Sequence, residues 1–163
     1  MGCGKHHNSG NCVADILRDI VDAQNDIVET CCETGCEQSI NDLLGESDDD
    51  NGRDTVPVIL YCKGTCKPFK GFGAQKFRHS DGSHGMTDII ASFIFRVKSI
   101  DKDNCAVLEL LLSDKQNCGN DHLKDPTDQD TSNLGRTGVC ITVDADCFCH
   151  VTCLPAISVF NND

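Results

Sequence analysis

The sequence has few cationic side chains and no long apolar run. Lysine and arginine together number 14 against 26 aspartates and glutamates, which gives a formal net charge of -12. This charge repels a phosphate backbone, and no cationic stripe overrides it, so no nucleic acid is expected as a partner. No apolar segment approaches the roughly 20 residues that span a bilayer, so no membrane partner is expected either.

The opening residues, MGCGKHHNSG, lack the apolar stretch of a signal peptide. Met1 and Gly2 match the start of a myristoylation signal, but His6 stands where that signal requires serine or threonine. We expect residues 1–11 to form a flexible leader that carries cysteine and histidine. Residues 12–163 are then expected to form a single cysteine-rich domain, a length that one hydrophobic core can serve.

Cysteine, by contrast, is abundant, with 13 among 163 residues. This is close to the level that is typical of a disulfide scaffold. Because the count is odd, at least one sulfur stays free, binds something or bonds to another molecule. Disulfides normally accompany export. The protein is therefore either reduced and metal-loaded in a cytoplasm, or oxidised after it reaches an oxidising place by another route.

Apolar residues recur at spacings of three and four through residues 12–30, from Val13 and Ile16 to Val28. This period predicts one amphipathic helix, and Gly35 is a suitable residue to follow its end. The polar side of the helix is acidic, which an anionic membrane would not attract. We therefore expect the helix to pack on the core of the domain.

From Thr55 onward, runs rich in branched and aromatic residues predict strands. The predicted strands cover residues 55–62, 92–100, 105–112, 138–145 and 146–153, with a further interrupted strand within 67–77. Residues 113–136 are expected to form a long surface excursion. The predicted fold class is mainly β, a small antiparallel β-sandwich with one N-terminal amphipathic helix.

Metal binding is the alternative function for so many cysteines. Structural zinc sites typically take ligands from C-x2-C pairs, of which this sequence has none, although C-x3-C occurs three times. A mixed cysteine and histidine site that uses Cys3, His6 and His7 remains open. We nevertheless expect no metal ligand and no other cofactor in the main function.

A catalytic site is not predicted. Cys149 and His150 are neighbours, but adjacent residues on a strand point to opposite faces, so we do not expect a nucleophile and its base. The sequence also contains no nucleophile elbow, phosphate loop or C-x2-C redox motif. We therefore expect no enzymatic activity and assign no catalytic residue.

Disulfide cross-linking fits the spacing of the cysteines better than metal binding or catalysis does. Alternate residues on a strand lie roughly 6.6 Å apart with parallel side chains, whereas a disulfide needs converging Cβ atoms. Cys147, Cys149 and Cys153 are thus expected to find partners on other strands or other molecules. In contrast, the turn between Cys62 and Cys66 could close a local bridge.

Most of the other candidate cysteines lie in flexible or edge segments. Cys105 and Cys140, on predicted inner strands, could equally be buried as small apolar side chains. The candidates for disulfides or cross-links are Cys3, Cys12, Cys31, Cys32, Cys36, Cys62, Cys66, Cys147, Cys149 and Cys153.

Several short motifs occur together in this chain. They are MGCGKHH followed by NCV, C-x-T-G-C at 32–36, DTVP at 54–57, F-x-F-R-V at 93–97 and CITVDADCFCHVTCL at 140–154. In these motifs and their order the chain resembles the spore outer-coat and exosporium proteins of the CotY, CotZ and ExsY family. The last motif is the most specific, and the resemblance covers nearly the whole chain.

The resemblance implies a non-enzymatic structural protein that self-assembles into a two-dimensional lattice of the spore coat or exosporium, fixed by disulfides between subunits. The implied partners are further copies of the chain, in rings for which a hexamer is one candidate, and other coat or exosporium proteins. The resemblance also implies synthesis without a signal peptide in the mother-cell cytoplasm. The implied final location is the spore surface.

Overall fold

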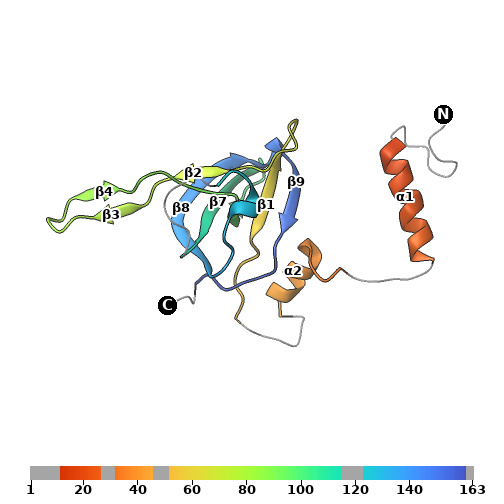
Figure 1. Ribbon diagram of the computed structural model, residues 1–163, viewed down its shortest axis with the longest axis horizontal. Helices are drawn as coiled ribbons and strands as arrows, with labels where there is room; N and C mark the ends of the chain where they lie inside the picture. The colour runs from red at the N-terminus through yellow and green to blue at the C-terminus, as the bar shows by residue number, and fades with distance from the viewer. Residues whose placement is uncertain (1–11, 27–31, 46–51, 115–122, 161–163) are drawn as a thin grey trace. The chain divides into compact units, whose positions relative to one another are not determined.

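The structure is a computed structural model that describes residues 12–26, 32–45, 52–114 and 123–160. It divides into two compact units, residues 1–33 and residues 34–163 (Figure 1). The expected leader of residues 1–11 lies outside the described residues.

The first unit contains helix α1 (Cys12–Asn25). Its apolar residues recur one turn apart and therefore share one side of the helix. Arg18 donates a hydrogen bond to the carboxylate of Asp15 at 3.2 Å, a contact one turn apart that stabilises the helix. The predicted N-terminal helix is confirmed over residues 12–25, and residues 27–31 lie outside the described residues.

Helix α2 (Cys36–Leu43) begins directly after Gly35. From the sequence, Gly35 was expected only as the residue that follows the end of the first helix. Gly35 has a φ of 149°, a conformation that L side chains rarely adopt. Within the helix, Gln38 donates to the carboxylate of Asp42 at 2.8 Å, four residues away. Eight residues give too few turns for an apolar period to be recognised, which explains why the sequence pattern missed α2.

The second unit is built on antiparallel sheets (Figure 1). A five-stranded sheet has the order β8-β7-β6-β1-β9, so β8 and β9 are its edges, while β2 pairs with β5 and β3 pairs with β4. The strands are β1 (Val58–Cys62), β2 (Gly71–Gly73), β3 (Lys76–Arg78), β4 (His84–Met86), β5 (Ile90–Ser92), β6 (Phe95–Ile100), β7 (Cys105–Ser113), β8 (Leu134–Asp144) and β9 (Phe148–Cys153). The predicted fold class, a mainly β structure consistent with a small antiparallel sandwich, is confirmed.

The run predicted as one strand at 92–100 forms two, β5 and β6, because the backbone hydrogen-bonds to side chains between them. The amide of Phe93 donates to Gln129 at 2.9 Å, and the amide of Ile94 donates to the hydroxyl of Ser92 at 2.9 Å. Gln129 is itself buried and donates to Ser92 at 2.8 Å. Part of the expected surface excursion at 113–136 therefore lies inside the protein.

Alternating side chains place a core on each face of the five-stranded sheet. Val58 belongs to one cluster of buried residues with Phe95 and Leu108. Its neighbour Ile59 belongs to a second cluster, which includes Leu111. Because strands of the five-stranded sheet contribute to both clusters, the sheet is the middle layer of the second unit.

The carboxylate of Asp54 fastens the C-terminal segment to the start of the sheet. It accepts hydrogen bonds from the amides of Val159 (3.0 Å) and Phe160 (3.2 Å) and from the hydroxyls of Thr55 (2.7 Å) and Ser158 (3.2 Å). Burial alone would raise the pKa of Asp54, but these hydrogen bonds to the charged form outweigh it and lower the pKa.

Replacing Asp54 with alanine should lower the free energy of unfolding by about 2 kcal/mol at neutral pH, because several hydrogen bonds to a charged acceptor are lost. Because the pKa of Asp54 is lower in the folded state, its charged carboxylate stabilises the fold at pH values above the unfolded-state pKa of about 4. This stabilisation is lost as the pH falls through the folded-state pKa. The difference between wild type and Asp54→Ala should thus shrink below about pH 4. Urea unfolding across pH measures it, with the exposed Asp88→Ala as control. A difference that persists unchanged at low pH would contradict this role.

Candidate functional site

One disulfide joins the helix α2 to the end of an edge strand. Cys36 and Cys153 are bonded with an S–S distance of 1.98 Å and a Cα–Cα distance of 4.7 Å, across 117 positions of sequence. The hydroxyl of Ser39 donates to the carbonyl of Leu154 at 2.7 Å beside this bond. Both cysteines are among the sequence candidates for a disulfide or a cross-link, and the bond that they form lies within one chain. Spacing along β9 could not reveal a partner on an unpredicted helix.

The other described cysteines fall into two groups. Cys12, at the start of α1, is disulfide-bonded. Seven carry free thiols, and of these only Cys62 is partly buried while the others are exposed: Cys32, Cys62, Cys66, Cys105, Cys140, Cys147 and Cys149. The candidates Cys3 and Cys31 lie outside the described residues.

Four of these free thiols gather where β1 and β9 meet. The turn after β1 is closed by the amide of Cys66, which donates to the carbonyl of Cys62 at 3.0 Å. The amide of Lys63 donates to the carbonyl of Cys147 at 2.7 Å, and the thiol of Cys149 donates to the carbonyl of Cys62 at 3.6 Å. The expected turn between Cys62 and Cys66 exists, but both of its thiols are free.

Two further thiols lie on the neighbouring strands β7 and β8. Cys140 lies on the edge strand β8, and Cys105 begins β7 opposite Asp144 of β8. Both are exposed, so neither is buried as a small apolar side chain, which was one of the two alternatives for these cysteines. Cys140 also lines a shallow hollow with Phe77, at the base of the β3–β4 hairpin.

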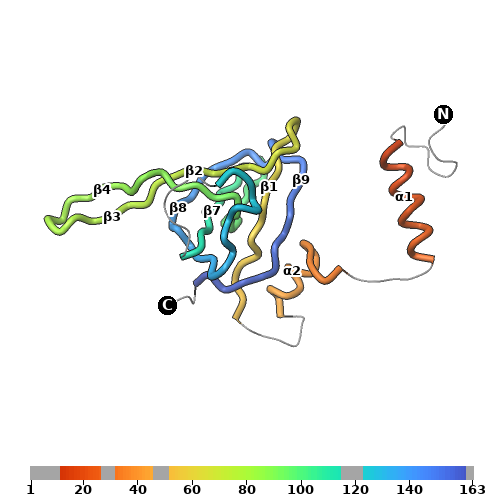
Figure 2. Tube along the Cα trace, viewed as in Figure 1, coloured from red at the N-terminus to blue at the C-terminus, as the bar shows by residue number. Residues whose placement is uncertain are grey.

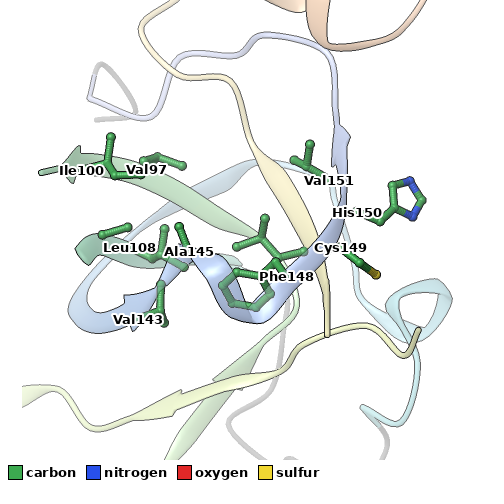
Figure 3. Close-up of a pocket in the computed structure, with 11 residues that line it drawn as sticks. Val97, Ile100, Leu108, Val143, Ala145, Phe148, Cys149, His150 and Val151 are labelled. Atoms are coloured by element: carbon green, nitrogen blue, oxygen red, sulfur yellow. The ribbon is translucent and has the colours of Figure 1, made fainter. Parts of the chain in front are cut away.

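Cys149 and His150 do not follow simple strand alternation, because the ladder between β1 and β9 shifts register at Tyr61 and Cys62. Figure 3 shows both side chains directed away from the neighbouring apolar residues. The ring of His150 stacks on Tyr61 with their centroids 4.3 Å apart. The imidazole is therefore held by a cross-strand aromatic contact, and the sequence argument from opposite faces does not apply at this bulge.

Within the described ranges, no three or more histidine, cysteine, aspartate or glutamate side chains lie together in a way that could hold a metal ion. The expected alternative ligands Cys3, His6 and His7 lie outside those ranges. No helix in the described part of the chain is long and apolar enough to cross a membrane.

An apolar groove of about 400 Å³ opens beside the thiols of β9. Figure 3 shows that its lining comes from strands on both sides, with Val97 and Ile100 across from Phe148 and Val151. The groove exists because β1 and β6 pair only at Val58 and Phe95 and then separate. Sequence periodicity does not report such a separation, so the groove was not predicted.

The fold and the thiols together define a small cysteine-rich β domain that is closed by a disulfide between Cys36 and Cys153 and presents several free thiols on its surface. Residues 1–156 match the family model described as spore coat protein Z. The chain is also 32% identical over 153 residues to spore coat protein Z of Bacillus subtilis (strain 168), with 90% of each chain covered. No solved structure gives a significant match.

The chain therefore belongs to the spore coat protein Z family, which confirms the resemblance stated from the sequence motifs. Membership assigns a structural role in the spore coat and a location at the spore surface, and it implies a protein that is not an enzyme.

Removing the internal disulfide by changing Cys36 and Cys153 together to alanine should destabilise the oxidised monomer by about 2–5 kcal/mol, because a very long loop is released in the unfolded chain. Reduction should destabilise the wild type by more than it destabilises the double variant, in which, among the described residues, only the bond of Cys12 remains to be reduced. Chemical unfolding with and without reductant measures both effects. Equal stability of the oxidised wild type and the double variant would contradict a structural role for this bond.

Proposed function

We propose that this protein assembles with further copies of itself into a two-dimensional lattice of the spore coat or exosporium, which disulfides between subunits then fix. One observation supports this most strongly: free, exposed thiols lie on both edge strands of the central sheet, Cys140 on β8 and Cys149 on β9. The hydrogen-bonding groups along the outer side of an edge strand are open to another molecule. Thiols at such edges are therefore accessible to neighbouring subunits.

Non-covalent contacts between different patches of identical subunits form closed rings when the rotation closes, and further contacts in a plane join rings into a sheet. We propose rings of this kind, a hexamer being one candidate, with other coat or exosporium proteins as neighbours. Synthesis in the mother-cell cytoplasm keeps the thiols reduced until assembly.

Oxidation then makes the assembly persistent. Two thiols from neighbouring subunits form one S–S bond and give up two protons and two electrons to an oxidant such as molecular oxygen, which is reduced to water or peroxide. Disassembly afterwards requires a reductant or rupture of a covalent bond, so the lifetime of the lattice no longer depends on the affinity of the contacts. A long-lived lattice of this kind suits the envelope of a dormant cell.

Changing Cys140 and Cys149 of the edge strands and Cys147, which directly precedes β9, together to serine should abolish most covalent oligomers, because the thiols at the edges are lost while the Cys36–Cys153 disulfide remains. Non-reducing electrophoresis of air-oxidised protein measures the oligomers, and electron microscopy should still show ordered particles, since the contacts that build them are non-covalent. The matched control is Cys62→Ser on the interior strand β1, which should retain cross-linking. An unchanged ladder of oligomers in the triple variant would contradict the proposed role of the edges.

A further inference from the structure

The β3–β4 hairpin, residues 76–86 and here called the arm, extends away from the five-stranded sheet (Figures 1 and 2). Its two strands have only three residues each. An isolated two-stranded hairpin is marginally stable in water. At its base the arm is held by the amide of Thr87, which donates to the carbonyl of Gln75 at 2.9 Å. An exposed arm of this kind gains stability when a second surface covers it.

One face of the arm combines positive charge with a large apolar side chain. Residues directly opposite one another in an antiparallel ladder share a face, and the register pairs Lys76 with Met86 and Arg78 with His84. These four side chains therefore lie on one face, and all are exposed, Met86 to 72%. The ring of Phe77 lies on the other face, against Gly85. The cationic face is unusual in a chain with a net charge of -12.

The lining of the apolar groove is complementary to the apolar side chain that the arm exposes. Ile100 (56% exposed), Val97 and Val151 (45% each) leave its apolar lining open to solvent. Large exposed apolar side chains gathered in a hollow are typical of an interaction site. The occupant must therefore supply an apolar side chain.

Carboxylates border the end of this groove. Ile100 is followed by the β6–β7 turn, and Ala145 lies between two further aspartates. The bordering charges are four aspartates, partly offset by two lysines: Asp101, Asp103, Asp144 and Asp146 with Lys98 and Lys102. Asp101 accepts from the amide of Cys105 at 2.9 Å and Asp146 accepts from the side chain of Asn104 at 3.1 Å, so the backbone and a side chain fix these carboxylates in position. The border is thus net negative, opposite in sign to the arm.

We propose that the arm of one copy docks in the apolar groove of a second copy, with Met86 in the groove and Lys76 and Arg78 facing the bordering carboxylates. Methionine suits this place because its flexible thioether adapts to irregular apolar surfaces. Opposite charges on the two surfaces steer the encounter and fix its orientation. The arm and the groove are different patches, so the contact is head-to-tail and repeats from copy to copy, as a ring or a sheet requires. The inference rests on the proposed self-assembly and names its non-covalent contact.

The test measures association of the full chain in the presence of reductant, where disulfides between subunits cannot form, by analytical ultracentrifugation over a range of salt concentrations. Changing Lys76 and Arg78 together to glutamate should weaken association by about tenfold or more, because like charges then face each other. Association of the wild type should also weaken with added salt. Met86→Asp should weaken it at every salt concentration.

A charge exchange makes the test specific. The variant with Asp144→Lys and Asp146→Lys should also associate poorly by itself, but an equal mixture of the two charge-reversed variants should recover association, since each arm again meets a border of opposite charge. The matched control changes Arg53 and the exposed Lys124 to glutamate, the same change in net charge at residues that neither lie on the arm nor line the groove, and should associate like the wild type. Thermal unfolding verifies that each variant is folded.

The outcomes separate this contact from self-assembly itself. Wild-type association that is unaffected in the arm variants, or variants that do not recover on mixing, would overturn the arm-to-groove contact and leave the proposed lattice standing. A wild-type chain that stays monomeric with and without reductant would overturn both.

Discussion

The open edges of the five-stranded sheet are the constraint on which the rest of the structure depends. A strand at an edge has one side without a partner strand, so whatever it carries is available to another molecule. In this protein the edges β8 and β9 carry cysteines, and the sheet between them buries its apolar residues on both faces. The fold thereby keeps the groups that stabilise it inside and leaves reactive groups at its borders.

The cysteines consequently serve two different purposes. Cys36 and Cys153 close the fold, since their bond ties α2 to the end of β9 within one chain. The thiols of Cys140 and Cys149 remain free at the edges, where they make no such bond. In the proposed assembly, subunits associate reversibly while their edge thiols are still reduced and become covalently linked later, so errors of assembly can be corrected before oxidation fixes them.

The sequence predicted the strong periodic features and missed those set by tertiary contacts. The helix at 12–25 and the main strands follow from apolar spacing, and the family follows from its cysteine motifs. Helix α2 has too few residues for a visible period, and the disulfide partner of Cys153 lies on it. The break at Ser92 depends on Gln129, 37 residues away. The divergence of β1 from β6, which opens the groove, likewise has no local signal in the sequence.

The most direct measurement is disulfide mapping by mass spectrometry in sheets assembled from an equal mixture of ¹⁴N-labelled and ¹⁵N-labelled chains. If the edge thiols join neighbours and the internal bond completes each subunit, peptides linked through Cys140, Cys147 or Cys149 will include pairs of mixed label. Peptides that link Cys36 to Cys153 will carry a single label. Mixed labels in the Cys36–Cys153 pair, or single labels in every pair, would contradict this account.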